Sequence, residues 1–189
     1  MEESYYQFLI HIKYLQDTRT GLWFHGWNFK ERNHFAGALW ARGNCWITAG
    51  IPEYIEIMGL KGVGKRYLTE TLVRQIEALS GFQCEDGMWN TLLDDPFSYE
   101  ETSATAGFAY GILKAVRLEL VEANYLPIAE KAVRAVLSHV EEDGTVNQVS
   151  YGTGMGRDLE HYRRIPMCPM AYGQALVILM LNEVRKVLL

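Results

Sequence analysis

The sequence lacks any uninterrupted apolar run that approaches the ~20 residues a membrane-spanning helix requires. Its first residues, MEESYYQ, show neither the basic region nor the apolar region of a secretory signal. Positive charge is also sparse, because 18 Lys and Arg stand against 23 Asp and Glu and are scattered along the chain. We therefore expect a cytoplasmic protein that binds neither a membrane nor nucleic acid.

Cysteine and metal-ligand patterns are equally sparse. The three cysteines, Cys45, Cys84 and Cys168, are odd in number, far apart and in no CxxC pair, which argues against a disulfide framework and against a zinc site. The histidines show no metal-binding spacing with one another. We expect reduced thiols, no metal and no cofactor.

What the sequence does contain is a repeat. Amphipathic helical patterns are followed three times by an acidic residue and a glycine, and these glycines, Gly21, Gly87 and Gly144, are 66 and 57 residues apart. A period of about sixty suits one helical hairpin with its loops. The 189 residues, 49% of them hydrophobic, then fit three hairpins in a single domain spanning residues 1–189.

The two helices of each predicted hairpin differ in pattern. The first helices have a one-sided apolar stripe and should be half exposed. The stripes are Tyr5, Phe8, Leu9, Ile12 and Leu15; Leu68, Leu72, Ile76 and Leu79; and Leu126, Ala129, Val133, Val136 and Val140. The second helices, at 41–58, 102–116 and 169–181, are apolar around most of their circumference and should be buried. Short β-like segments at 21–27 and 144–150 should form connecting loops.

Alternating half-exposed and buried helices predict an all-α fold in two concentric layers, as in an (α/α)6 toroid or a helical solenoid. Three antiparallel hairpins make half of a closed six-hairpin ring. The buried helices at the two ends would then leave apolar flanks open. We expect these flanks to be covered by a second copy, by a complementing chain or by the rest of a longer ancestral domain.

A candidate site lies where the second helix of the first hairpin begins. Trp40, Arg42 and Trp46 gather there, with Arg42 and Trp46 four residues apart, and His25 lies in the preceding loop. Tryptophan faces stack on sugars, and a guanidinium can bind a carboxylate through two parallel hydrogen bonds. These residues fit a site for an acidic sugar. The alternative is a core cluster in which Trp fills space and Arg42 binds loop carbonyls.

The same stretches resemble a known family. TGLWFHGW, LWARGNCW, LLDD and SATAGFAYGILKAV are similar to segments of the unsaturated rhamnogalacturonyl hydrolases, α/α-barrel glycoside hydrolases related to the unsaturated glucuronyl hydrolases. The resemblance covers the whole chain but only about the C-terminal half of the family's domain. It implies removal of a terminal 4,5-unsaturated galacturonic acid from rhamnogalacturonan-derived oligosaccharides during pectin degradation. It also implies that an aspartic acid protonates the double bond and that water adds at C5.

The resemblance places His25, Trp40, Arg42 and Trp46 around the unsaturated uronate, with Arg42 recognising the carboxylate. It does not place the catalytic aspartate, which in the family precedes the helix that begins here at Tyr5. We therefore expect the general acid to be missing from these residues and the chain to be a truncated form of the domain.

Three aspartates remain as candidates for the acid. Asp86 follows a predicted helix, and Asp94 and Asp95 precede Pro96. A general acid needs a carboxyl group near the reacting atom with a raised pKa. Each also has a structural interpretation, because Asp is common in turns and at helix starts.

Two functions therefore remain open. The first is a glycoside hydrolase that acts on unsaturated uronate-containing oligosaccharides, with activity only if the missing half is supplied. The second is a non-catalytic half-toroid that binds acidic sugars or self-associates.

Overall fold

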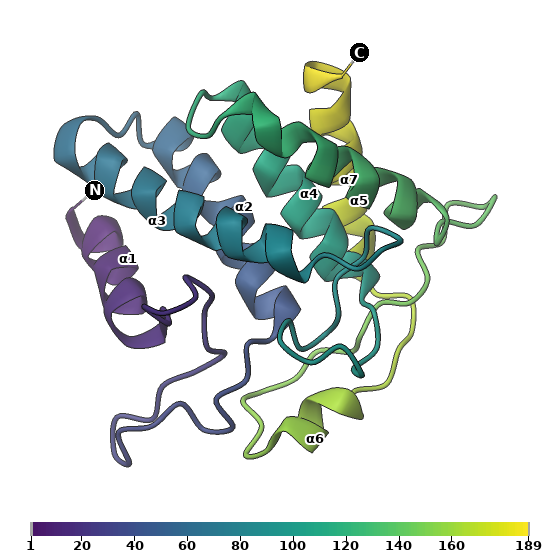
Figure 1. Cartoon of the computed structure of the whole chain (residues 1–189), viewed down its shortest axis with the longest axis horizontal. Coiled ribbons are helices and arrows are strands. Elements are labelled where there is room, and N and C mark those ends of the chain that lie inside the picture. Colours follow the sequence, from purple (N-terminus) through teal and green to yellow (C-terminus); the bar gives the residue numbers. More distant parts are fainter. Residues whose placement is uncertain (1, 189) are drawn as a thin grey trace.

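The computed structural model describes residues 2–188, and its helices form three consecutive hairpins (Figure 1). The long helices are α1 (Glu2–Leu15), α2 (Ala41–Ile57), α3 (Gly62–Phe82), α4 (Thr102–Arg117), α5 (Leu126–Leu137) and α7 (Ala171–Val187). A 3-10 turn, η1 (Ala123–Tyr125), precedes α5, and a short helix, α6 (Leu159–Arg163), lies in the last long loop. The mostly helical structure confirms the predicted fold class.

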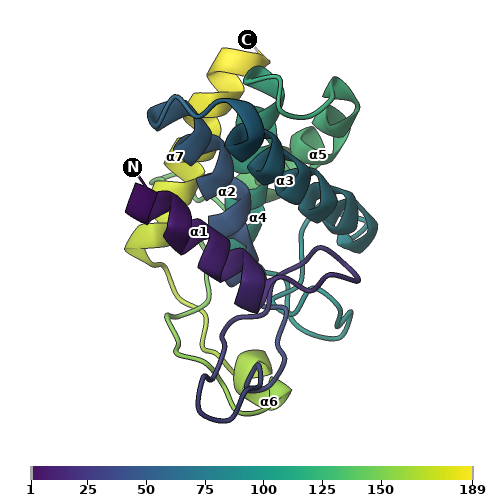
Figure 2. The same ribbon diagram turned by 90° about the vertical axis from the view of Figure 1, so that its left-hand side faces the viewer.

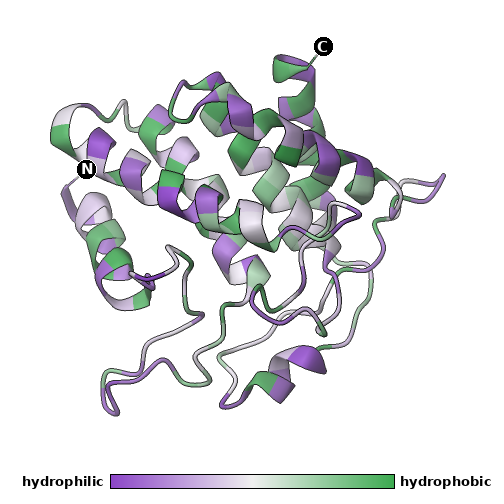
Figure 3. Ribbon diagram, viewed as in Figure 1, coloured by the Kyte–Doolittle hydropathy of each residue, from purple (hydrophilic) through white to green (hydrophobic). Residues whose placement is uncertain are grey.

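The helices form two layers. In the inner layer α4 lies between α2 and α7 and packs against both. In the outer layer α3 packs on α2 and α5 packs on α4 (Figures 1 and 2). Hydrophilic residues recur along α3 and α5 (Figure 3). The predicted stripe of α3 is fully buried at Leu68, Leu72, Ile76 and Leu79, as expected for an amphipathic outer helix.

Close packing of the inner helices depends on two glycines of α4. A Cβ atom on Gly107 would lie 2.8 Å from Sγ of Cys45, and one on Gly111 would lie 2.4 Å from the carbonyl oxygen of Thr48. Because these glycines have no side chain, the backbones of α2 and α4 can approach closely. Residues 102–115 of α4 are all buried, which confirms the prediction for the middle inner helix.

The predicted burial of the third inner helix is wrong in part. Ile178, Leu179 and Leu181 of α7 expose 58%, 41% and 36% of their surface. At the other end of the layer, Trp46 and Ile57 of α2 expose 49% and 74%. Within residues 2–188 each end helix has one inner neighbour, so its second flank stays open. The expectation that the half-ring leaves apolar flanks exposed is confirmed.

The repeated glycines lie beyond the helix ends, which corrects their predicted role as helix stops. The helices end at Leu15, Phe82 and Leu137, five to seven residues before Gly21, Gly87 and Gly144. Each glycine has a positive φ and closes its own turn, with its N–H bonded to a backbone oxygen three or four residues earlier. An acidic residue followed by glycine favours such a turn without any helix before it.

The connecting loops have only traces of β structure, which within residues 2–188 consists of isolated antiparallel bridges such as Gln16 with Trp23 and Val140 with Val146. The three cysteines are free thiols. In the part of the chain that the structure describes, no helix is both long enough and apolar enough to span a membrane.

Candidate functional site

Three long loops gather at one end of the helical layers. They comprise residues 16–40, 83–101 and 138–170, and each leads into the start of an inner helix (Figures 1 and 2). We call this end, where α2, α4 and α7 begin, the mouth. All the sequence-predicted site residues lie on these loops or on the first turns of α2.

Arg42 is at the centre of the mouth and is only 3% exposed. Its Nη1 donates to the carbonyl oxygen of Ser150 at 2.6 Å, to Oγ of Ser150 at 2.8 Å and, at 3.4 Å, to Oγ of Ser103. Its Nη2 donates to the carbonyl oxygen of Tyr151 at 2.7 Å. Arg42 therefore ties the last long loop to the starts of α2 and α4.

Glu101 provides the opposite charge beneath Arg42. Its Oε1 lies 3.5 Å from Nη1 of Arg42, and both side chains are almost wholly buried. The carboxylate also accepts the Ala104 N–H at 2.6 Å, which caps α4, and the Ser150 N–H at 2.9 Å. A buried carboxylate with this many donors fixes the positions of two chain segments at once.

Aromatic rings enclose the guanidinium. Its carbon lies 4.6 Å from the ring centroids of both Trp40 and Tyr172, so the cation packs against two π faces. The ring of His25 packs against the ring of Trp40, with 4.4 Å between the two ring centroids. The structure thus brings His25, Trp40 and Arg42 into one cluster, as the sequence predicts.

Burial changes the titration of His25. Its pKa is lowered to about 4, because desolvation disfavours the charged ring and the neighbouring Arg42 and His161 disfavour it further. Its Nδ1 lies 2.7 Å from the hydroxyl of Tyr162. The ring is therefore neutral at pH 7, where it can donate one hydrogen bond and accept another but adds no positive charge to the mouth.

We expect the stability of the protein to fall between pH 6.5 and pH 4 because of His25. In this window the unfolded chain takes up a proton on the histidine and the folded chain does not, so protonation favours unfolding. Urea midpoints at pH 7.5 and pH 5 should differ less in His25→Gln than in the wild type. The exposed His11 offers a matched control, and an undiminished pH dependence in His25→Gln would contradict the assignment.

Trp46 stands apart from the cluster. It lies one helical turn beyond Arg42 and exposes 49% of its surface. Trp40, by contrast, exposes only 6%. Of the two tryptophans predicted to stack on a sugar, only Trp46 therefore presents a large open face.

Two of the three candidate acids are held in other roles. Asp95 accepts a hydrogen bond from Nε of Arg163 at 2.7 Å, which holds the pKa of its carboxyl below the usual range and keeps it ionised. Asp86 accepts the Met88 N–H at 2.9 Å within its turn. Asp94 is exposed on the same loop. None of the three forms a hydrogen bond or ion pair with the cluster around Arg42 in the contacts of residues 2–188.

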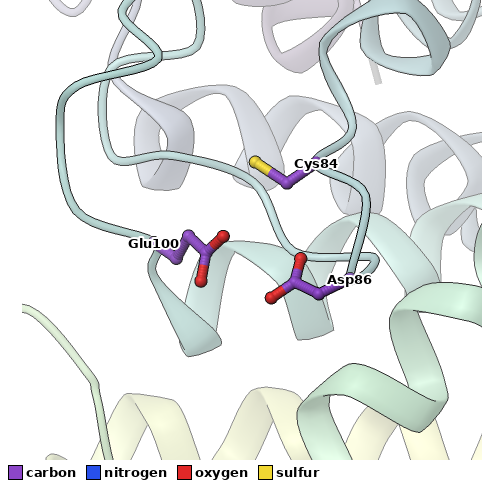
Figure 4. A group of neighbouring side chains, drawn as sticks. All are labelled: Cys84, Asp86 and Glu100. Atoms are coloured by element: carbon purple, nitrogen blue, oxygen red, sulfur yellow. The ribbon is translucent and has the colours of Figure 1, made fainter.

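A group of possible metal ligands lies in the loop between α3 and α4 (Figure 4). The ligand atoms of Cys84, Asp86 and Glu100 are all within 4.8 Å of one another. Burial, and then the charge of Asp86, raise the pKa of Glu100, and burial with the two carboxylates raises the pKa of Cys84. A bound cation would relieve the repulsion between these acidic groups, and so would protonation of one of them. The prediction of no metal therefore stays a prediction.

Two hollows differ in their suitability for an acidic ligand. One of about 270 Å³ is lined by Asn28, Glu31, Asn33, Phe35 and Arg157, on loops that lead into the mouth. Another, of about 680 Å³, lies at the opposite end of α4, and three glutamates, Glu77, Glu119 and Glu122, line it. An anionic sugar fits the first better, because the second repels it.

Sequence reasoning missed several residues of the cluster. Glu101, Ser150, Tyr162 and Tyr172 were not singled out, although the repeat held a signal for one of them. Arg42 and Tyr172 are both the second residue of an inner helix, as is Ser103. An alignment of the three hairpins on their inner helices would have brought these residues together.

Comparisons with known proteins agree with this geometry. A sequence profile described as Glycosyl Hydrolase Family 88 matches residues 1–188. The chain is 34% identical over 186 residues to a Bacillus subtilis (strain 168) protein named unsaturated rhamnogalacturonyl hydrolase YesR, covering 98% of this chain and 52% of that protein.

Solved structures show the same fold. A possible member of the GH105 family from Salmonella enterica superposes with a TM-score of 0.97 and 52% identity, covering 100% of this chain and 50% of that one. A counterpart from Klebsiella pneumoniae gives a TM-score of 0.95 and 53% identity, covering 98% of this chain and 49% of that one. The chain thus spans about half the length of these relatives.

Proposed function

Given that the chain belongs to glycosyl hydrolase family 88, we propose that it forms half of an α/α toroid that hydrolyses the terminal 4,5-unsaturated galacturonic acid from rhamnogalacturonan-derived oligosaccharides. The observation that carries this proposal is the 34% identity, over nearly the whole chain, to a protein named for unsaturated rhamnogalacturonyl hydrolysis. We further propose that the protein acts in pectin degradation and is cytoplasmic.

We propose that the sugar binds at the mouth, against uncharged aromatic side chains that lie near the buried Arg42. His25 is neutral and half-exposed, and Trp46 presents an open ring for stacking. Because the Nη atoms of Arg42 already bind the 150–151 backbone, direct recognition of the sugar carboxylate would require this loop to shift. We propose that Arg42 chiefly holds the glycine-rich 150–158 loop in place over the mouth.

The general acid is proposed to come from outside these 189 residues. Arg163 lowers the pKa of Asp95 and holds it ionised, whereas general acid catalysis requires a carboxyl group with a raised pKa, and Asp86 accepts the Met88 N–H within its own turn. The same observations favour the alternative function, in which the isolated chain binds an acidic sugar without hydrolysing it.

Both functions can be tested with an unsaturated rhamnogalacturonan disaccharide. The folded chain should bind it saturably, as followed by tryptophan fluorescence, and His25→Ala should weaken binding about tenfold, the loss of one hydrogen-bonding side chain. The matched control is His11→Ala, on the outer face of α1. Absence of saturable binding by the folded wild-type chain would refute the sugar site.

The absorbance of the C4=C5 double bond then separates hydrolysis from binding alone. We expect a flat trace from residues 1–189 alone and decay once the other half of the domain that the relatives carry is supplied. Decay from the isolated chain would show that the acid lies within residues 1–189. Binding with no decay under either condition would leave the sugar-binding function and exclude hydrolysis.

A further inference from the structure

The two open flanks of the inner layer have matching patterns that follow from the helical repeat. The inner helices α2, α4 and α7 begin at Ala41, Thr102 and Ala171, so equivalent residues recur 61 and then 69 positions later. Each helix uses one face to contact the inner helix before it and another to contact the one after it. The face of α2 toward a preceding helix and the face of α7 toward a following helix are the two that remain open.

Among the described residues, two of the four ion pairs between neighbouring inner helices repeat in this register, and each joins the sixteenth residue of one helix to the thirteenth residue of the next. Glu56 of α2 lies 2.8 Å from Nζ of Lys114 of α4, and Arg117 of α4 pairs with Glu183 of α7. The pair thus repeats at equivalent positions, with its charges exchanged.

The same positions at the open ends have opposite charges. The sixteenth residue of α7 is Lys186, whose side chain is 54% exposed, and the thirteenth residue of α2 is Glu53, whose side chain is 34% exposed. A third pair in the series therefore needs Lys186 on one side and Glu53 on the other. Each already has a partner within its own chain: Lys186 pairs with Glu183, and Glu53 pairs with Lys114.

The register also brings the apolar residues of the two open flanks together. Between α2 and α4 the fifth residue, Cys45, faces the sixth residue of the next helix, Gly107. The equivalent residues at the open ends are Ala175 of α7 and Trp46 of α2, and both are exposed in the single chain. Ile178 and Leu179 would meet the open surface at Gly50, where an added Cβ has no atom within 4 Å.

We propose that a second copy of this chain covers both flanks, with α7 of each copy packed against α2 of the other around a two-fold axis. Three hairpins from each copy then complete a ring of six. The charges favour a second copy over an unspecified partner, because one chain carries both members of the missing pair. Trp46 then borders both the interface and the mouth.

The association of the unmodified chain is the first test, and it does not depend on the proposed hydrolysis. Light scattering should give twice the chain mass of 21.6 kDa. Ile178→Asp should weaken the dimer about a hundredfold, because the interface would bury an unpaired charge. Leu137→Asp is the matched control, since Leu137 is an exposed apolar residue of α5, outside both flanks, and should leave the dimer intact. Circular dichroism checks that both variants are folded.

Directed cross-linking tests the arrangement itself. Cys84 and Cys168 are replaced by Ser, and two further variants are made, one with Ala175→Cys and the other with Trp46→Cys. A mixture of the two should form a disulfide-linked dimer under mild oxidation, because the equivalent atoms of Cys45 and Gly107 lie close enough for a disulfide. Neither variant alone should cross-link, because the two copies of each position lie at opposite interfaces.

Three results would overturn the proposal. A monomeric wild-type chain would exclude the second copy as the occupant. A dimer that Ile178→Asp leaves unchanged would place the interface elsewhere. Cross-linking by Ala175→Cys alone would indicate that α7 pairs with α7 and would exclude the ring. Loss of sugar binding by a chain that still dimerises would count against the proposed function and leave this inference intact.

Discussion

Replacement of Arg42 by Met is expected to lower the free energy of unfolding by about 3–5 kcal/mol, the usual cost of removing one partner from a buried ion pair. Arg42 is 3% exposed, and its removal leaves the carboxylate of Glu101, which is wholly buried, without a countercharge. The carbonyl oxygens of Ser150 and Tyr151 also lose a donor. Urea denaturation at pH 7 measures the difference.

A double-mutant cycle identifies the ion pair as the cause. Glu101→Gln in the Arg42→Met background removes the stranded charge and keeps a side chain that can accept hydrogen bonds, so it should restore at least ~1 kcal/mol. In the wild-type background the same substitution should destabilise. Additive effects, to within about 0.5 kcal/mol, would mean that the loss in Arg42→Met comes from packing and not from the charge pair.

Gly111→Ala is expected to cost about 1–3 kcal/mol, the range for overpacking a tight core. The new Cβ would lie 2.4 Å from the carbonyl oxygen of Thr48 and 2.9 Å from the backbone nitrogen of Ala49. These are backbone atoms of α2, so no side chain can rotate away, and the two inner helices must separate. Alanine's higher helix propensity offsets this by only ~1 kcal/mol.

The matched control is Gly81→Ala, in the last turns of α3. An added Cβ there has no atom within 4 Å, so stability should stay within about 0.5 kcal/mol of the wild type or rise slightly. Thermal unfolding of both variants side by side measures the contrast. Equal stability of Gly111→Ala and Gly81→Ala would show that close approach of α2 and α4 is not required.

The fold could be predicted from local patterns. Helix type follows from the spacing of apolar residues, and the sixty-residue period alone sets three hairpins, because each hairpin must bury its stripe against a neighbour. The outcome at α7 was different. Its sequence is apolar around most of the helix, like that of α4, yet several of its apolar residues are exposed. Burial depends on how many helices pack against a helix, and the spacing of apolar residues does not encode that number.

The site shows the same division. Sequence placed His25, Trp40 and Arg42 together because tryptophan and arginine side chains cluster at one helix start and His25 lies in the loop before it. It could not decide whether Arg42 binds a ligand or the chain itself, since that depends on Ser150 and Tyr151, more than 100 residues away. The pairing with Glu101 was equally hidden.

The sequence by itself therefore determined the helices, their pairing into hairpins and their resemblance to a glycoside hydrolase family, because these depend on local spacing and motif. Only the tertiary structure decided that the central arginine is enclosed, that Asp95 is held by Arg163 and that the end helices carry complementary charges. Those properties arise from contacts between distant segments, and the distances and burial of such contacts exist only in the folded chain.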